Sequence, residues 1–228
     1  DNVEVREWAS LGADDVPEDA DVVVVAGPQS NFVEPELDLL RDFVFRGGRM
    51  LILLDPVFLE GGTPVDTGLE TFLGELGVDV GFDVVLDPDN PIPFFGPESL
   101  FVTSFGDTPV TRPLREGDFP VIVSLSRSVS AAGSADATVT EMLLTSPRGW
   151  AERDLEALFA GGVERDDADL AGPVSLGVTV EREMAGESGG EAEPEDVDEA
   201  KDAAAPPKAR LVIVGDSDLA ANRLVQGN

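Results

Sequence analysis

Histidine, cysteine and tyrosine are absent from this 228-residue chain. Without histidine there is no imidazole with a pKa near neutrality, which excludes a Ser-His-Asp triad. The absence of cysteine excludes a thiol nucleophile, a disulfide and a Cys/His zinc site. The chemistry that remains depends on carboxylates, hydroxyls, Lys and Arg, including oxygen-ligand sites for Mg²⁺ or Ca²⁺. These residue types point to no cofactor.

Basic residues are scarce: 15 Lys and Arg stand against 46 Asp and Glu, for a net charge of −31. Such a field repels nucleic acid and anionic membrane surfaces, so neither is an expected partner. Part of the acidity lies in residues 183–209, which are rich in Glu, Gly, Ala and Pro and low in apolar residues. This composition predicts a disordered acidic loop. The acidity of the remainder is consistent with adaptation to salt or with a coding bias.

Three continuous apolar runs, at 22–27, 50–56 and 211–216, have the length of strands and lack polar alternation. Such runs are typical of strands buried on both faces of a parallel sheet. Between the first two runs, residues 35–46 have helical periodicity and end at a Gly pair, which together predict a βαβ unit. The apolar run that follows the acidic loop must rejoin the sheet, so the loop is an insertion within one domain spanning 1–228.

The rest of the chain adds further expected elements. The predicted fold class is α/β, with an open, mostly parallel sheet flanked by helices and an antiparallel portion at its edge. Helices are expected at 66–77 and 150–162, an extended segment at 78–87, an irregular proline-rich loop at 88–97, and more alternating strands at 119–126, 138–146 and 173–181.

Polar residues follow two of the apolar runs. Asp216, Ser217 and Asp218 come directly after the last run, and Asp55 ends the second. Open α/β sheets bind ligands at the carboxyl ends of their strands, so these residues are candidate ligand or metal positions. The alternative is structural: Ser217 or Asp218 caps a following helix, and Asp55 with Pro56 forms a turn. The structural interpretation needs no ligand and is favoured.

The proline-rich loop brings a second candidate surface. Phe94, Phe95 and Phe101 lie in or near it, and exposed phenylalanines there would suit partner docking. Packing of the same rings beneath the loop is the equally simple alternative.

Four segments in order suggest a family. They are "EDADVVVVAGPQSNFVEPELDLLRDFVFRGGRMLILLDP", "GDTPVTRPL", "LLTSPRGWAERD" and "ARLVIVGDSDLAANRLVQGN". Together they resemble the soluble domain of the GldG-like, gliding-motility-associated auxiliary proteins of ABC transporters. The resemblance covers most of residues 18–228, and the second segment lacks the histidine usual in that family.

The resemblance implies an open α/β sandwich similar to the glutamine-amidotransferase-like and intraflagellar-transport GIFT folds, without a catalytic cysteine. It implies a non-catalytic, extracytoplasmic (periplasmic) interaction domain, anchored in the inner membrane by flanking helices outside this chain. Its expected partners are the permease and ATPase subunits of an ABC transporter or gliding system. The chain itself has no apolar run of about 18 residues or more and starts at Asp1 in mid-pattern, so we expect a fragment of a longer membrane protein. The alternative is a carboxylate- or metal-dependent hydrolase, or a small-ligand module, at the strand ends.

Overall fold

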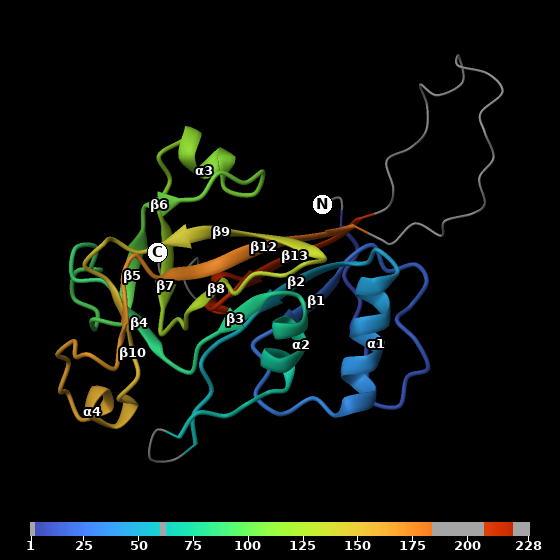
Figure 1. Cartoon of the computed structure of the whole chain (residues 1–228), viewed down its shortest axis with the longest axis horizontal. Helices are drawn as coiled ribbons and strands as arrows, with labels where there is room; N and C mark the ends of the chain where they lie inside the picture. Colours follow the sequence, from blue (N-terminus) through green and yellow to red (C-terminus); the bar gives the residue numbers. More distant parts are fainter. Residues whose placement is uncertain (1–2, 60–62, 184–207, 221–228) are drawn as a thin grey trace.

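A computed structural model describes residues 3–59, 63–183 and 208–220. These residues form a mixed α/β fold that is rich in strands and has few helices (Figure 1). The main sheet has the strand order β1-β2-β13-β12-β8-β3, and β9 pairs with both β12 and β6. The predicted α/β class is confirmed.

The three apolar runs form three neighbouring parallel strands of this sheet. They correspond to β1 (Val23–Ala26), β2 (Arg49–Leu53) and β13 (Lys208–Val214), with β2 in the middle. Val23 lies opposite Met50, which in turn lies opposite Leu211. The prediction that the last run returns to the centre of the sheet is confirmed.

The antiparallel part begins inside the sheet, next to β13, and is broader than the edge portion predicted. Here β12 (Ser175–Glu183) pairs antiparallel with both β13 and β9 (Ala137–Leu144). Glu183 ends β12 opposite Lys208, to which it forms an ion pair of 3.0 Å. The two ends of the predicted acidic loop therefore belong to paired strands, and residues 184–207 lie outside the described residues.

Short strands complete the main sheet and form two smaller antiparallel sheets. In the main sheet, β3 (Val78–Val80) pairs with β8 (Val129–Ala131), and β6 (Ser104–Phe105) pairs with β9. The smaller sheets consist of β4 (Val84–Leu86), β10 (Trp150–Glu152) and β11 (Leu170–Ala171), and of β5 (Ser99–Val102) with β7 (Val121–Ser124).

The predicted helix over 150–162 is wrong in its first part. Trp150 and the two residues after it pair with β4 as a strand, and α4 spans only Leu155–Phe159. The helix starts where it does because the Asp154 side chain accepts a hydrogen bond of 2.9 Å from the N–H of Ala157. The second half of the described chain also contains the short helix α3 (Arg112–Glu116) and the 3-10 turn η1 (Asp218–Ala220).

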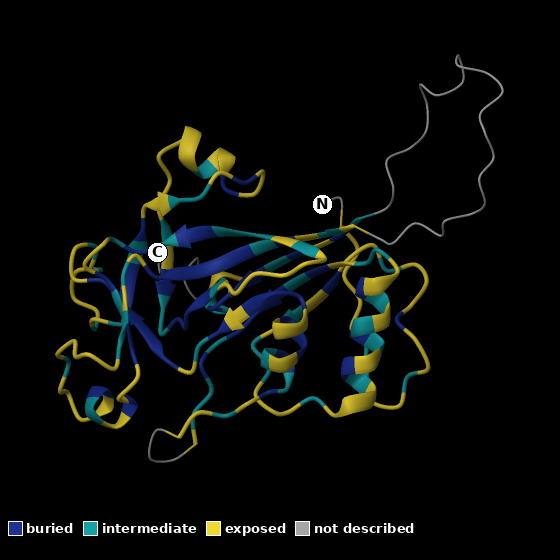
Figure 2. Cartoon of the chain, in the orientation of Figure 1, coloured by how far each residue is buried: buried dark blue, intermediate teal, exposed yellow. Residues whose placement is uncertain are grey.

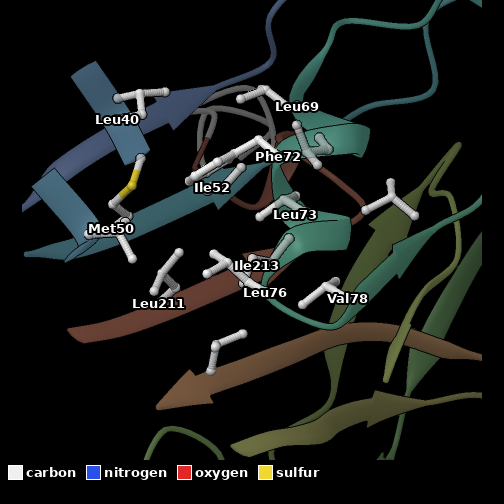
Figure 3. Packing of buried hydrophobic residues seen from close by; sticks show 14 of the residues in the cluster. Leu40, Met50, Ile52, Leu69, Phe72, Leu73, Leu76, Val78, Leu211 and Ile213 are labelled. Atoms are coloured by element: carbon white, nitrogen blue, oxygen red, sulfur yellow. The ribbon is translucent and has the colours of Figure 1, made fainter. Parts of the chain in front are cut away.

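Both predicted helices of the first third are present and pack on one face of the main sheet (Figure 1). Helix α1 (Glu34–Phe45) begins with Pro35 in its first turn, and α2 (Leu69–Glu75) ends before Gly77, which has φ 81°. Each helix is buried toward the sheet and exposed on its outer side (Figure 2). Figure 3 shows Phe72 and Leu73 of α2 directed toward sheet residues such as Ile52.

The opposite face of the sheet, near the carboxyl ends of β2 and β13, packs against the β5–β7 pair instead of a helix. Leu53 and Val214 share a buried cluster there with Leu100, Val102 and Val123. Within the described residues, the prediction that helices flank the sheet is therefore confirmed for one of its two faces. No helix within the described ranges is long and apolar enough to cross a membrane.

Candidate functional site

The carboxyl ends of β2 and β13 bring the four polar candidates together. Asp55 follows β2, and Ser217 follows β13 two residues after Gly215. The Ser217 N–H and the Ser217 hydroxyl donate hydrogen bonds of 2.5 and 2.6 Å to the two oxygens of Asp55. Gly27, at the end of β1, packs against the same pair of residues. Its φ is 56°, and a Cβ at this position would lie 2.8 Å from Ser217 Oγ. These bonds tie neighbouring strand ends to one another.

Asp216, the residue before Ser217, is fully buried. Its Oδ2 accepts a bond of 2.7 Å from the N–H of Ser124, and its Oδ1 accepts one of 2.6 Å from the N–H of Asp218. Burial raises the pKa of Asp216 to about 6, with smaller contributions from the negative charges of Asp55 and Asp218, although the two backbone N–H groups act in the opposite direction. Asp216 therefore joins β7 to the end of β13 and starts the η1 turn.

The arrangement suits a structural corner better than a metal or hydrolytic centre. Every carboxylate oxygen of Asp55 and Asp216 already accepts a hydrogen bond from the chain. Across the described residues, no group of three or more acidic side chains is placed to hold a metal ion. The residue whose side chain caps the η1 turn is Asp216, because the Ser217 hydroxyl is committed to Asp55.

Asp55 and the residues from Asp216 to Asp218 form what we call the strand-end corner. Beside this corner lies a cavity of about 770 Å³. One wall is the strand-end corner with Asp55, a second is formed by Glu98 and Leu125 near the β5–β7 pair, and a third by Phe159 and Val163 around α4. These segments gather at one end of the main sheet (Figure 1). Sequence reasoning found the first wall only, because the other two come from stretches with no local motif.

The backbone near the cavity is unusual at one position. Leu125 lines the cavity and has φ 55°, a left-handed conformation that a branched side chain seldom adopts. Its N–H donates to the carbonyl of Glu98 at 3.0 Å, which holds the second wall together. This bond links the segment before β5 to the segment after β7.

The candidate phenylalanines separate into two environments. Phe94 and Phe95 are 105% and 68% exposed, whereas Phe101 lies within β5, half-buried and opposite Ile122 of β7. The structure therefore brings Phe94 and Phe95 together at a loop tip and places Phe101 on the adjoining strand pair.

Sequence reasoning missed a buried ion pair. Arg127 is 1% exposed, and its Nη1 lies 2.9 Å from Glu70 Oε1 at the start of α2. Its Nε donates to the carbonyl of Gly81 at 2.6 Å, and its guanidinium lies 5.1 Å from the centre of the Phe82 ring. These contacts hold α2, the β3–β4 turn and the segment before β8 in place. No motif marks Arg127 in the sequence.

Asp87 likewise has a structural role. Both oxygens of its carboxylate accept hydrogen bonds from Ser146, which joins the proline-rich loop to the segment after β9. Burial alone raises the pKa of Asp87, but the bonds from Ser146, Asn90 and Asp89 outweigh it and leave the pKa below its ordinary value.

Comparison with known proteins assigns the chain to a family. Among curated proteins none matches the sequence. The solved structure described as "mmIFT52 N-terminal domain" is similar, with a TM-score of 0.48 and 16% identity. That similarity covers 86% of this chain and 66% of the other, so the chain matches just under two thirds of that domain. The family described as "ABC-type uncharacterized transport system" matches residues 2–228. The chain therefore belongs to this family of auxiliary proteins of ABC-type transport systems.

Proposed function

We propose that this chain is a non-catalytic, extracytoplasmic domain that docks onto the permease of an ABC-type transport system. Family membership supports an auxiliary role in such a system. The resemblance to the gliding-motility branch favours a parent protein that is anchored in the membrane. In this proposal the ATPase subunit associates with the chain indirectly, through the permease. The observation that carries the docking role is the pair of exposed rings at Phe94 and Phe95.

The loop that carries these rings is well defined by backbone hydrogen bonds. The N–H of Phe95 donates to the carbonyl of Ile92 at 3.2 Å, and the N–H of Ser99 donates to the carbonyl of Gly96 at 3.0 Å. Ile92 in turn donates to the carbonyl of Ser99 at 3.1 Å. A loop held in this way presents its side chains with little further loss of entropy on binding.

The Phe94 backbone is strained as well as exposed. Its φ of 72° places a bulky side chain in the left-handed region, which costs about 1–2 kcal/mol. Packing of the ring within this chain does not offset that cost, because the ring is fully exposed. Strain retained at an exposed aromatic residue is typical of a functional position. Burying each ring in a partner would contribute about 1.5–3 kcal/mol.

The net charge of the chain limits which kinds of partner surface can bind it. With a net charge of −31, the chain is repelled by anionic surfaces and attracted by basic ones. The surface that fits Phe94 and Phe95 is an apolar pocket with a basic rim on a protein. Insertion into an anionic membrane is disfavoured by the same charge and is an outcome that the test below distinguishes.

The non-catalytic part of the proposal is supported by residue chemistry. The chain has no histidine or cysteine, and each oxygen of the strand-end carboxylates Asp55 and Asp216 accepts a hydrogen bond that holds the fold. A carboxylate fixed by such bonds cannot turn toward a substrate without giving them up, so it is poorly placed as a base.

The test is co-purification of the tagged parent protein from detergent-solubilised membranes of its host, with permease and ATPase identified by mass spectrometry. Changing Phe94 and Phe95 to Ser should reduce recovery of both subunits at least about tenfold. Phe119→Ser is the matched control, because Phe119 is 62% exposed and lies in another loop. Equal recovery with the double variant, or no transporter subunit with the wild type, contradicts the proposal. In a second assay, the wild type and the double variant are mixed with liposomes and floated on a density gradient. If the double variant no longer floats with the liposomes but still recovers both transporter subunits, the rings bind the membrane instead.

A further inference from the structure

The cavity beside the strand-end corner has the size of a small-molecule site. Its volume of about 770 Å³ falls within the range of ligand pockets, roughly 300–1,000 Å³. It also lies at the carboxyl ends of parallel strands, which is where open α/β sheets bind ligands. Neither the docking loop nor the family assignment gives this cavity a role.

The charged residues that line the cavity are all acidic. Asp55, Glu98 and Asp218 line it, and none of the described lining residues is a Lys or an Arg. In the described part of the chain neither Asp55 nor Glu98 forms an ion pair. A phosphate or carboxylate ligand would face repulsion here, whereas a cation would be attracted.

Two of these carboxylates have lone pairs for a ligand. Each Asp55 oxygen accepts one bond from Ser217, and a carboxylate oxygen can accept two. The Glu98 carboxylate folds over Gly96, where a Cβ would lie 2.2 Å from Glu98 Oε2. The carboxylate therefore lies against the backbone of Gly96, and Glu98 itself lines the cavity. An ammonium group, with three donors, matches acceptors arranged on two walls.

The lining also has an apolar and partly aromatic part. Leu125, Phe159 and Val163 form much of it. Phe159 packs against Phe58 with ring centres 5.4 Å apart, yet stays 55% exposed. An aromatic ring open to a cavity offers both an apolar surface and a face for a cation. A bare metal ion would leave this surface unused.

We propose that the cavity binds a small organic ammonium ion. Its charged group lies between Asp55 and Glu98, and its apolar body packs against Leu125, Phe159 and Val163. This site is separate from the docking role of Phe94 and Phe95 and does not depend on it.

The test is a titration of the ¹⁵N-labelled chain with 2-phenylethylamine, followed by NMR. We expect saturable shifts centred on the amides of the residues that line the cavity, such as Gln29, Leu125 and Gly161. The neutral analogue 2-phenylethanol and the anion 3-phenylpropionate should bind much more weakly, and KCl should weaken amine binding by screening. Shifts spread over the whole acidic surface, or equal binding of the anion, would overturn the proposal.

Variants locate the site. Glu98→Gln should raise the Kd for the amine by about three- to fivefold, and Phe159→Ala by a similar factor. Glu116→Gln is the matched control, since Glu116 is an exposed carboxylate on α3 away from the cavity lining. If Glu116→Gln weakens binding as much as Glu98→Gln, the amine recognises only the overall charge. If no amide shift saturates at millimolar amine, the cavity does not bind this class of ligand.

Discussion

Ser217 donates two hydrogen bonds to Asp55, one from its backbone N–H at 2.5 Å and one from its hydroxyl at 2.6 Å, each to a different oxygen. The two residues are 162 positions apart in the chain, yet they follow neighbouring parallel strands, β2 and β13. Gly27, at the end of β1, lies against the same pair. The serine of this Gly-Asp-Ser sequence therefore serves to join strand ends. Its hydroxyl is a donor to a carboxylate, with no imidazole to activate it.

The first prediction concerns the acceptor in this joint. Asp55→Ala should lower the free energy of unfolding by about 2 kcal/mol, because the Ser217 N–H is left without its partner. Asp55→Asn should cost less, since the Ser217 hydroxyl can turn and accept a bond from the new amide. Urea denaturation of the two variants measures the difference. Equal losses for Ala and Asn would show that the hydrogen bonds to Ser217 contribute little.

A second prediction follows from the buried carboxyl of Asp216. Burial raises its pKa from an ordinary value of 3.8 to about 6, so the folded chain holds this proton more strongly than the unfolded chain. The stabilisation is complete below about pH 4 and is lost as the pH rises through about 6. The groups that face this carboxyl are Asp55, Asp218 and the N–H of Ser124.

The measurement for Asp216 is the unfolding free energy of wild type and Asp216→Asn between about pH 4 and pH 7. Relative to the variant, the wild type should lose about 2 kcal/mol over that interval. Subtracting the curve of the Asp216→Asn variant removes the pH dependence that all the other acidic groups contribute to both proteins. Parallel curves for the two proteins, or a ¹³C titration that places the Asp216 pKa near 3.8, would contradict the prediction.

A third prediction concerns the ion pair between Arg127 and Glu70. Arg127→Met should cost about 3–5 kcal/mol, because it leaves the buried Glu70 carboxylate without its counter-charge. Adding Glu70→Gln should recover more than about 1 kcal/mol, while the Gln side-chain oxygen can still accept from the Thr67 N–H that now bonds to Glu70. A double-mutant cycle by chemical denaturation measures this coupling. Additive losses would mean that the two charges do not stabilise one another.

These residues show which parts of the molecule were predictable. Continuous apolar runs predicted β1, β2 and β13, and periodic leucines predicted α1 and α2, because burial on two faces or on one stripe leaves a local signature. Strand-end geometry then predicted that Asp55, Asp216, Ser217 and Asp218 lie at one edge of the sheet. Trp150 was placed in a helix because its local pattern suits one, whereas pairing with β4 made it a strand.

Other features had no local signal. Arg127 reads as an ordinary surface cation until the fold places it against Glu70, Gly81 and Phe82. The cavity walls at Glu98 and Phe159 come from segments that only the tertiary structure brings together. Exposure at Phe94 depends on the backbone conformation at that residue, which the loop composition does not specify.

The last prediction tests the proposed extracytoplasmic location. Because the chain lacks cysteine, a single introduced thiol reports on one position without background from this domain. Ala135→Cys is exposed on the loop between β8 and β9, whereas Ala209→Cys lies fully buried in β13. In spheroplasts with intact inner membranes, a membrane-impermeant maleimide should label the parent protein at position 135 as fully as after permeabilisation. Position 209 should stay unlabelled in both, which checks that the domain is folded. Labelling of position 135 only after permeabilisation would place the domain on the cytoplasmic side and would remove the extracytoplasmic part of the proposed function.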